Sequence, residues 1–349
     1  MVCGGCFRRE SLAGQETASS GREEAGFQEM ISDDLLRGVS RSFYLSLRVL
    51  PVELRPQISL AYLLARASDT VADTKAVPRQ RRLQLLGDMR RSDFRSVSEL
   101  ASGQALPAER LLLERLGDCV AELESLTPDD RGLIRSLLDT IVSGQILDLE
   151  RFPGESEREL AALSDDAELD RYTYLVAGCV GEFWTRMCAA HLSAFAALDQ
   201  GEMVRLGVRF GKGLQLVNVL RDLAGDLRIG RCYLPAAQPR RLLDPGNFDE
   251  VREIYGQWLD TALGHLDAGW RYVLCLPPQL WRLRLACIWP IWIGLGTIAL
   301  LRRSNPLDPS RRVMVAQNRV YFFLVQSALF SRSDRLLGLT YRRLRAAAL

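Results

Sequence analysis

The feature that most constrains the fold is a helical spacing of apolar residues that runs through most of the chain. From Phe27 onward, apolar positions recur every three or four residues, as in residues 96–126 and 130–152. This spacing is typical of amphipathic α-helices. Runs of alternating β-branched residues are scarce, and the Asn-Gly and Asp-Gly pairs that favour tight hairpins are absent from the sequence. The sequence therefore predicts an all-α protein.

The composition fits one large folded domain. The chain has 349 residues, 48% of them hydrophobic, and its proline-containing breaks fall at turns rather than in a linker. Residues 1–26 are rich in Gly, Ser, Glu and Arg and lack the apolar stretch of a signal peptide. We expect a disordered tail over residues 1–26 and a single domain over residues 27–340.

The charge and the histidine and cysteine content limit the classes of function that fit this chain. The formal net charge is only +2, so bulk charge gives no indication of a nucleic-acid partner. Two histidines, His191 and His265, are too few for a His-rich metal site and make a Ser-His-Asp triad a poor candidate. The eight cysteines are scattered, which favours reduced thiols and a cytoplasmic protein.

One segment, residues 285–301, is apolar enough to be considered as a membrane span. It has 17 residues, at the lower limit for crossing a bilayer, and it contains Pro290. We expect it to be a buried core helix. An apolar product channel or a membrane-facing surface is the alternative.

A first polar stripe lies in residues 64–74, LARASDTVADT. At about 100° per residue, Arg66, Asp69 and Asp73 fall on one face of a helix that is otherwise apolar. Like charges four residues apart repel each other, and burying them unpaired costs more still. A solvated helix face paired with Arg66 would explain a single stripe of this kind.

A second stripe makes that explanation less satisfactory. Gln215, Asn218, Asp222 and Asp226 lie within about 80° of one another on a helix, between apolar flanks and beside Arg221. A shared divalent cation would relieve the repulsion in both stripes, because Mg2+ is usually bound by a few carboxylates together with substrate phosphates. The two stripes are therefore interpreted as two walls of a cavity that binds a diphosphate through Mg2+.

Four segments, two of which contain these stripes, resemble, in order, the signatures of the squalene and phytoene synthase family. They read SRSFYLSLRVLP (40–51), ARASDTVADT (65–74), YTYLVAGCVGE (172–182) and QLVNVLRDLAGDLRIGRCYLP (215–235). The order and spacing match over nearly the whole expected domain. The resemblance implies an isoprenoid-synthase helical bundle with a central cavity. It also implies an enzyme that joins two prenyl diphosphates head to head.

The resemblance assigns roles to matching residues. The four aspartates of the stripes match the Mg2+ ligands of the family. Arg66 matches an arginine that contacts the diphosphate, Phe43 an aromatic residue at the start of the prenyl tunnel, and Tyr172 a tyrosine near the developing cation. The other matching positions are expected to bind substrate: Ser40, Arg41, Ser42, Gln215, Asn218, Arg221, Val176, Cys179 and Phe183. For Val176 and Cys179, ordinary helix packing is the alternative.

Within the family, the resemblance favours squalene as the product. Residues 282–303 resemble the matching squalene synthase helix, and the basic segment 310–320 lies where squalene synthases carry residues linked to NADPH. Arg311 and Arg312 are therefore the expected NADPH contacts. We expect two farnesyl diphosphates to be condensed through a cyclopropyl diphosphate, in the presence of Mg2+, and reduced to squalene. Dehydrosqualene or phytoene synthesis without reduction is the alternative.

The sequence leaves the class of protein, the substrate length, the oligomeric state and membrane contact open. A non-catalytic helical scaffold of the same fold is the alternative from another class, although all four aspartates are present. Substrate length, C15 or C20, and oligomeric state are undecided. A peripheral membrane contact assisted by arginines is a further alternative, because the product is an insoluble isoprenoid. Gln145, Asp148 and Glu150, in the segment 145–152, either support the ligand-binding residues from behind or lie at a solvated helix end, and we expect the solvated helix end.

Overall fold

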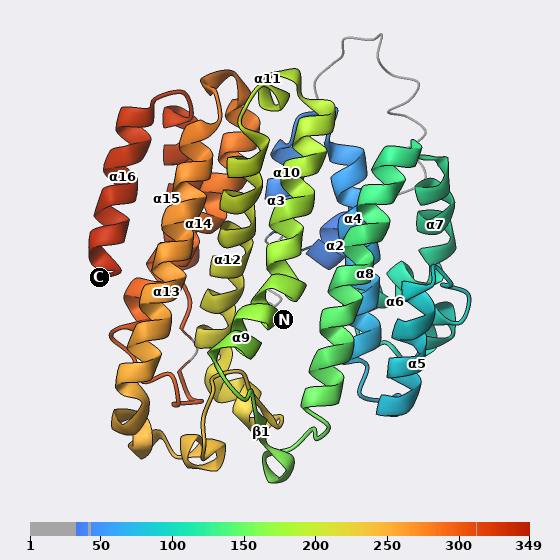
Figure 1. The fold of residues 1–349 in the computed structure, drawn as a ribbon, viewed down its shortest axis with the longest axis vertical. Helices are drawn as coiled ribbons and strands as arrows, with labels where there is room; N and C mark the ends of the chain where they lie inside the picture. Colours follow the sequence, from blue (N-terminus) through green and yellow to red (C-terminus); the bar gives the residue numbers. More distant parts are fainter. Residues whose placement is uncertain (1–32, 41–42, 312) are drawn as a thin grey trace.

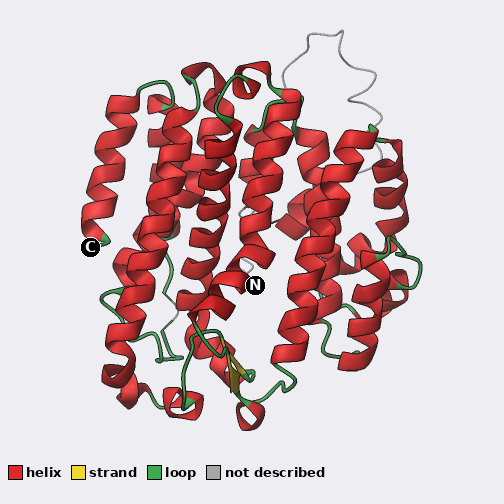
Figure 2. Cartoon of the chain, in the orientation of Figure 1, coloured by secondary structure: helices red, strands yellow, loops and turns green. Residues whose placement is uncertain are grey.

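The computed structural model describes residues 33–40, 43–311 and 313–349. In this part of the chain, long helices run roughly parallel or antiparallel to one another along the longest axis of the molecule (Figure 1). Helix dominates the cartoon, and two short paired strands lie near one end of the bundle (Figure 2). The prediction of an all-α fold is confirmed. The tail expected over residues 1–26 lies outside the described residues.

The first half contains α2 (Asp33–Ser40), α3 (Tyr44–Val49), α4 (Arg55–Asp73), α5 (Arg79–Arg90), α6 (Pro107–Glu114), α7 (Leu116–Ser125) and α8 (Pro128–Arg151). The second half contains α9 (Asp166–Thr173), the π-helical turn η4 (Tyr174–Gly178), α10 (Cys179–His191), α11 (Ser193–Ala196), α12 (Gln200–Arg228), α13 (Phe248–Cys275), α14 (Trp281–Leu301), α15 (Gln317–Phe330) and α16 (Asp334–Ala347). Short 3-10 turns are η2 (Val97–Gly103), η3 (Glu157–Glu159), η5 (Pro239–Leu243), η6 (Pro245–Asn247) and η7 (Pro278–Leu280).

Helix α12 occupies the middle of the bundle and packs against α13, α10, η4, α14 and α9. Its first turn is capped by Asp199, whose side chain accepts a hydrogen bond from the Glu202 backbone N–H. Buried leucine and valine residues, among them Leu216 and Leu220, fill the core on its flanks. The second polar stripe is therefore carried by a helix that the core holds on several sides.

Glycines let α12 approach its neighbours closely. A Cβ on Gly211 would overlap the carbonyl oxygen of Ala177, in η4, and one on Gly181, in α10, would overlap the carbonyl oxygen of Gly207. Only glycine permits these backbone contacts. The glycine-containing segment 207–213 lies within α12, and close helix packing explains its glycines.

Helix α14 forms part of the core. The described residues contain one helix that is long and apolar enough to cross a membrane, over Pro278–Leu301, but 72% of its most apolar window is buried inside the fold. It packs against α13, α3, α12, α15 and α16, and it runs through Pro290 without ending. The prediction of a buried core helix over residues 285–301 is confirmed.

The two strands fix the segment that follows α12. Strand β1 (Ala161–Ala162) pairs in parallel with β2 (Arg231–Cys232). Between α12 and β2 lies Gly230, whose φ of 87° is in the left-handed region that glycine adopts without strain. The sharp turn at Gly230 brings Arg231 back towards α8, where it forms an ion pair with Asp148.

Candidate active site

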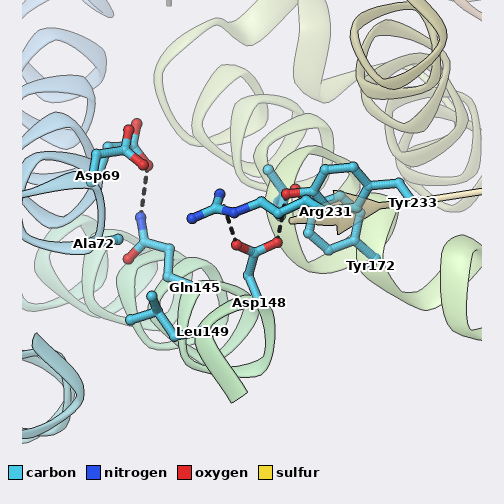
Figure 3. Close-up of a pocket in the computed structure, with 11 residues that line it drawn as sticks. Asp69, Ala72, Gln145, Asp148, Leu149, Tyr172, Arg231 and Tyr233 are labelled. Carbon is cyan, nitrogen blue, oxygen red and sulfur yellow. Dashed lines mark hydrogen bonds and ion pairs between the residues drawn. The ribbon is translucent and has the colours of Figure 1, made fainter. Parts of the chain in front are cut away.

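A cavity of about 110 Å3 lies between the helices of the first half and the segment around β2 (Figure 3). Helices α4 and α8 supply one side, and α9, η4 and β2 supply the other. Its lining combines carboxylates, one guanidinium and aromatic rings: Asp69, Ala72, Asp73, Gly144, Gln145, Asp148, Leu149, Tyr172, Val176, Arg231 and Tyr233. Ligand pockets usually measure about 300–1,000 Å3, so this cavity is smaller than a typical ligand pocket.

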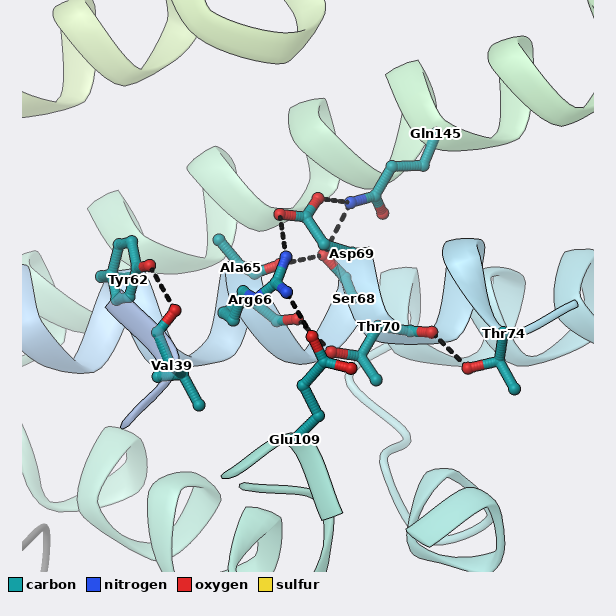
Figure 4. Close-up of polar contacts among 10 residues, drawn as sticks. All are labelled: Val39, Tyr62, Ala65, Arg66, Ser68, Asp69, Thr70, Thr74, Glu109 and Gln145. Carbon is teal, nitrogen blue, oxygen red and sulfur yellow. Dashed lines mark hydrogen bonds and ion pairs between the residues drawn. The ribbon is translucent and has the colours of Figure 1, made fainter. Parts of the chain in front are cut away.

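The first predicted stripe lies on α4 and faces this cavity. Asp69 and Asp73 both line it, while Arg66 forms an ion pair with Glu109 of α6 and lies 3.8 Å from Asp69 (Figure 4). Gln145, on α8, donates a hydrogen bond of 2.7 Å to Asp69. The expected helix face is therefore present, and Arg66 is partly neutralised by an acid from another helix.

Asp69 is surrounded by protein, yet 48% of its side chain is accessible to water, as befits a carboxylate that lines a cavity. Burial, followed by repulsion from Asp73, raises the pKa of Asp69 to about 6. Arg66 and Gln145 act in the opposite direction but do not cancel the rise. The negative charge on this wall is therefore incompletely compensated by the protein.

Gln145 and Asp148 correct one expectation from the sequence. Both side chains are buried and line the cavity, so the interpretation of a solvated helix end is wrong. The Oε1 atom of Gln145 is buried and has no hydrogen-bond partner among the described residues. A buried polar atom without a partner is uncommon, and it indicates that a ligand or an ordered water supplies the missing hydrogen bond.

Two residues of the site, Arg231 and Tyr233, were not singled out from the sequence. The Arg231 guanidinium lies 3.0 Å from one oxygen of Asp148, and the Tyr233 hydroxyl donates to the other at 2.7 Å (Figure 3). Although burial alone would lower it, the neighbouring Asp148 carboxylate raises the pKa of Arg231, so the guanidinium stays charged. Arg231 thus supplies a fixed positive charge at the cavity.

Tyr172 stacks on Tyr233, with ring centroids 4.7 Å apart and an interplanar angle of 25°. Phe152 meets the Tyr233 ring edge-on at 5.1 Å. The π-helical turn η4 begins two residues after Tyr172, and such turns are frequent at functional sites. Burial raises the pKa values of Tyr172 and Tyr233 far above the ordinary value, so both phenols stay protonated.

The second predicted stripe lies on α12 and is less tightly gathered. Asp222 is held in a two-point interaction by Arg221, with Nε to Oδ1 at 2.9 Å. Burial, followed by the charge of Asp222, raises the pKa of Asp226 to about 7, and Arg231 and Asp148 are also near enough to affect it. Gln215 is half-buried and Asn218 is exposed. None of these five α12 residues lines the 110 Å3 cavity itself.

The carboxylates act as two pairs rather than as one cluster. Among the described residues, no three His, Cys, Asp or Glu side chains gather into a group that could hold a metal ion. Each pair nevertheless contains a carboxyl group with a raised pKa, Asp69 in one and Asp226 in the other. Such donors suit Mg2+ that is bound by one or two carboxylates and completed by substrate phosphates.

Of the remaining expected substrate residues that the structure describes, Val176 alone lines the cavity. The Ser40 hydroxyl donates to the Leu36 carbonyl, and Phe43 stacks on Tyr62 at 5.4 Å. The Cys179 thiol donates to the Leu175 carbonyl, and Phe183 is buried. Arg41 and Ser42 lie outside the described residues. Their proposed roles stay predictions.

The expected NADPH contacts lie in the segment between α14 and α15. Arg311 is exposed there, and Arg312 lies outside the described residues. Arg311 does not line the 110 Å3 cavity. Their assignment to NADPH also stays a prediction.

Comparison with curated proteins finds several isoprenoid enzymes. The squalene synthase of Eremothecium gossypii is 30% identical over 308 residues, covering 85% of this chain and 67% of that protein. The squalene synthase of Yarrowia lipolytica is 27% identical over 239 residues, covering 66% and 52%. The presqualene diphosphate synthase of Rhodopseudomonas palustris is 30% identical over 195 residues, covering 56% and 58%. The matched region is thus about half the length of the Yarrowia protein.

Solved structures with the same fold are also found. A complex of TcSQS with the ligand BPH1237 has a TM-score of 0.72 at 20% identity and covers 93% of this chain and 92% of that one. A dehydrosqualene synthase in complex with a ligand has a TM-score of 0.59 at 16% identity, covering 88% and 99%. These likenesses establish the all-α isoprenoid-synthase fold.

A family model described as squalene/phytoene synthase matches residues 36–319, which include α4, α8, α12 and the whole lining of the cavity. The match spans most of the chain and agrees with the fold. This protein therefore belongs to the squalene/phytoene synthase family.

Proposed function

We propose that the protein is a prenyltransferase that condenses two farnesyl diphosphates head to head into a cyclopropyl diphosphate and reduces this intermediate to squalene with NADPH. One observation carries the proposal. In a single cavity, three aspartates and a charged arginine lie beside a pair of stacked tyrosine rings. A negatively charged leaving group requires the polar environment, and the carbocation that it leaves behind requires the aromatic one beside it.

The polar side of the cavity suits departure of a diphosphate. Arg231 and Arg66 offer positive charge to the leaving group, and a fixed guanidinium needs no reorganisation as charge develops. Asp69 and Asp73 would hold Mg2+ on α4, and Asp222 and Asp226 would hold it on α12. When bound, Mg2+ would neutralise the charge that develops on the diphosphate oxygens.

The aromatic side suits the cation left behind. The ring faces of Tyr172 and Tyr233 can stabilise positive charge, and their burial excludes the water that would quench it. Because both phenols stay protonated, their rings and hydroxyl dipoles are available to the cation, and neither phenol serves as a phenolate base. We therefore assign the two tyrosines to orienting the cation and stabilising its positive charge.

The reductive half of the proposal rests on the resemblance to squalene synthases, with Arg311 and Arg312 as NADPH contacts. One alternative is release of the cyclopropyl diphosphate, as the name of the Rhodopseudomonas relative indicates for that protein. Dehydrosqualene or phytoene formation is the other. The six cysteines of the described part are all free, which supports a cytoplasmic enzyme.

Product analysis tests the proposal. The purified protein would be incubated with farnesyl diphosphate and Mg2+, with and without NADPH, and the products identified by mass spectrometry. Squalene that requires NADPH, with cyclopropyl diphosphate accumulating without it, is the expected result. Cyclopropyl diphosphate or dehydrosqualene regardless of NADPH would overturn the reductive half. No turnover of farnesyl or geranylgeranyl diphosphate would overturn the enzyme and favour a scaffold.

A further inference from the structure

Helix α15 has a second apolar face that nothing in the described structure covers. Tyr321, Phe322, Val325 and Leu329 are 46%, 60%, 62% and 74% exposed. At about 100° per residue they share one arc of about 100°. The opposite side of α15, which includes the buried Phe323, packs against α14. Scattered single apolar residues are normal on a protein surface, but a continuous helix face is not.

The neighbouring helix also exposes apolar side chains. Helix α16 packs beside α15 and presents Leu336 and Leu339, which are 38% and 53% exposed. Met314, in the segment before α15, is 49% exposed. We call the six exposed apolar side chains of the two helices the α15–α16 face: Tyr321, Phe322, Val325, Leu329, Leu336 and Leu339.

Arginines surround this face without acidic partners. Residues 311–349 contain eight arginines and one aspartate, a net charge of +7, whereas the whole chain carries only +2. Within the described structure, five of the eight are exposed on or beside the two helices and form no ion pair: Arg319, Arg332, Arg335, Arg342 and Arg343. This end of the chain is therefore strongly cationic, while the remainder is net negative.

The one local carboxylate is already paired with a core residue. Asp334 forms an ion pair with Arg284, whose side chain is fully buried in α14. Arg345 is in turn bound by Asp267 of α13, at 2.9 Å. The charges that fasten α16 to the bundle are thus satisfied between helices, and they leave the surrounding arginines uncompensated.

The two helices are firmly seated. Trp289 of α14 donates to Ser327 of α15 at 2.8 Å, and Trp270 of α13 stacks on Tyr341 of α16 with centroids 4.4 Å apart. The α15–α16 face is therefore a preformed surface on a packed scaffold. Its exposure does not result from a loosely attached segment.

We propose that the α15–α16 face docks the protein on the surface of an anionic lipid bilayer. Apolar side chains enter the boundary between headgroups and acyl chains, tyrosine and phenylalanine suit that boundary, and each arginine near an anionic surface adds to the attraction. A second copy is a poorer occupant, because a two-fold interface would bring two sets of unpaired arginines together.

The proposal goes beyond the reaction and is independent of it. The cavity is built by α4, α8, α9, η4 and β2, none of which belongs to the α15–α16 face. In Figure 1, α16 forms one edge of the bundle, whereas α8 stands on the other side of α12. Docking would place the enzyme where an insoluble product can dissolve, whichever product that is.

Vesicle flotation without substrate tests the proposal. The full chain would be mixed with phosphatidylcholine vesicles, with or without about 30% phosphatidylglycerol, at low and high salt. We expect strong binding to the anionic vesicles that weakens at high salt. The double variant Phe322→Ser/Leu329→Ser should lose at least about tenfold in binding, because it removes apolar side chains that would enter the bilayer.

Matched variants separate the apolar and charge contributions. Ile254→Ser/Leu274→Ser changes two residues of α13 that are 45% and 44% exposed, and it should bind like the parent. Arg335→Gln/Arg343→Gln should reduce binding to anionic vesicles and remove most of the salt dependence. Thermal unfolding and turnover in detergent check that each variant is folded.

Three results would overturn the proposal. The first is vesicle binding that the Phe322→Ser/Leu329→Ser variant retains in full, and the second is no vesicle binding by the parent chain. The third is a parent dimer, seen by analytical ultracentrifugation, that this variant dissociates and that does not bind vesicles. That result would assign the face to a second copy. Because no substrate is present, none of these results depends on the proposed reaction.

Discussion

The carboxylate of Asp148 joins the guanidinium of Arg231 at 3.0 Å, across 83 residues of sequence, and so links α8 to β2 beside the cavity. The other oxygen of the same carboxylate accepts from Tyr233. One buried side chain therefore orients both the positive charge and one of the two stacked rings. Asp148 is a positioning residue in this arrangement.

Asp148→Asn should impair catalysis more than folding. The amide keeps the shape of the side chain but leaves Arg231 without a buried counter-charge, which should cost about 1–3 kcal/mol of unfolding free energy. A displaced guanidinium should lower kcat on the order of 100-fold. Asp139→Asn on the same helix removes only an exposed ion pair with Arg90 and should cost under about 1 kcal/mol. Equal kcat for the two variants would contradict the role of Asp148.

Asp226 should make the metal-free protein less stable as pH rises. Its pKa is about 7 in the folded protein, against an ordinary value of 3.8. Between these values the folded protein holds a proton that the unfolded chain has released, so stability falls as pH rises from about 4 to 7. Asp226→Asn should therefore raise the melting temperature at pH 8 in EDTA, by a few degrees, and flatten this pH dependence.

Mg2+ provides the second half of that test. If Asp226 helps to hold the ion, Mg2+ should raise the melting temperature of the parent protein at pH 8 more than at pH 5, where the carboxyl group is protonated. Asp226→Asn should reduce the gain at pH 8. Equal stabilisation of both proteins by Mg2+ would remove Asp226 from the list of ligands.

The contact between α10 and α12 should tolerate no added atom at Gly207. A Cβ there would lie 2.6 Å from the Thr185 hydroxyl and 2.7 Å from the Gly181 carbonyl oxygen, and the backbone oxygen has little room to move. We expect Gly207→Ala to destabilise the fold by about 1–3 kcal/mol. Gly256→Ala is the control, because a Cβ at Gly256 in α13 meets nothing within 4 Å. It should be neutral or stabilising by up to about 1 kcal/mol. Urea unfolding midpoints compare the two.

Local sequence signals predicted the helices and the α4 side of the cavity. Apolar spacing is a property of neighbouring residues, so the helical class and the face shared by Asp69 and Asp73 could be deduced from it. The burial of α14 could be anticipated as well, because its length and its proline favoured a core helix. These features need no knowledge of how distant segments meet.

The α8–β2 side of the cavity could not be predicted in the same way. Gln145 and Asp148 resemble residues of a solvated helix end until Arg231 and Tyr233 return to them through the turn at Gly230. A two-residue strand has no periodicity that a sequence pattern could reveal. The quoted segment 215–235 did contain Arg231 and Tyr233, so their proximity to the aspartate stripe was the available signal.

Tyr172 should act through its ring face. Tyr172→Phe keeps the aromatic face that stacks 4.7 Å from Tyr233, so we expect kcat to fall by about tenfold or less. Tyr172→Leu keeps a large apolar side chain but removes the π face, and should lower kcat by on the order of 100-fold. Loss of cation stabilisation should also divert farnesyl diphosphate to alcohols formed by water capture, which mass spectrometry of the products would detect. Tyr255 is not part of the cavity lining, and its buried hydroxyl donates a hydrogen bond to the Leu220 carbonyl, so Tyr255→Phe controls for removal of a buried hydroxyl. If Tyr172→Leu matches Tyr172→Phe in rate and in product distribution, the ring serves packing alone.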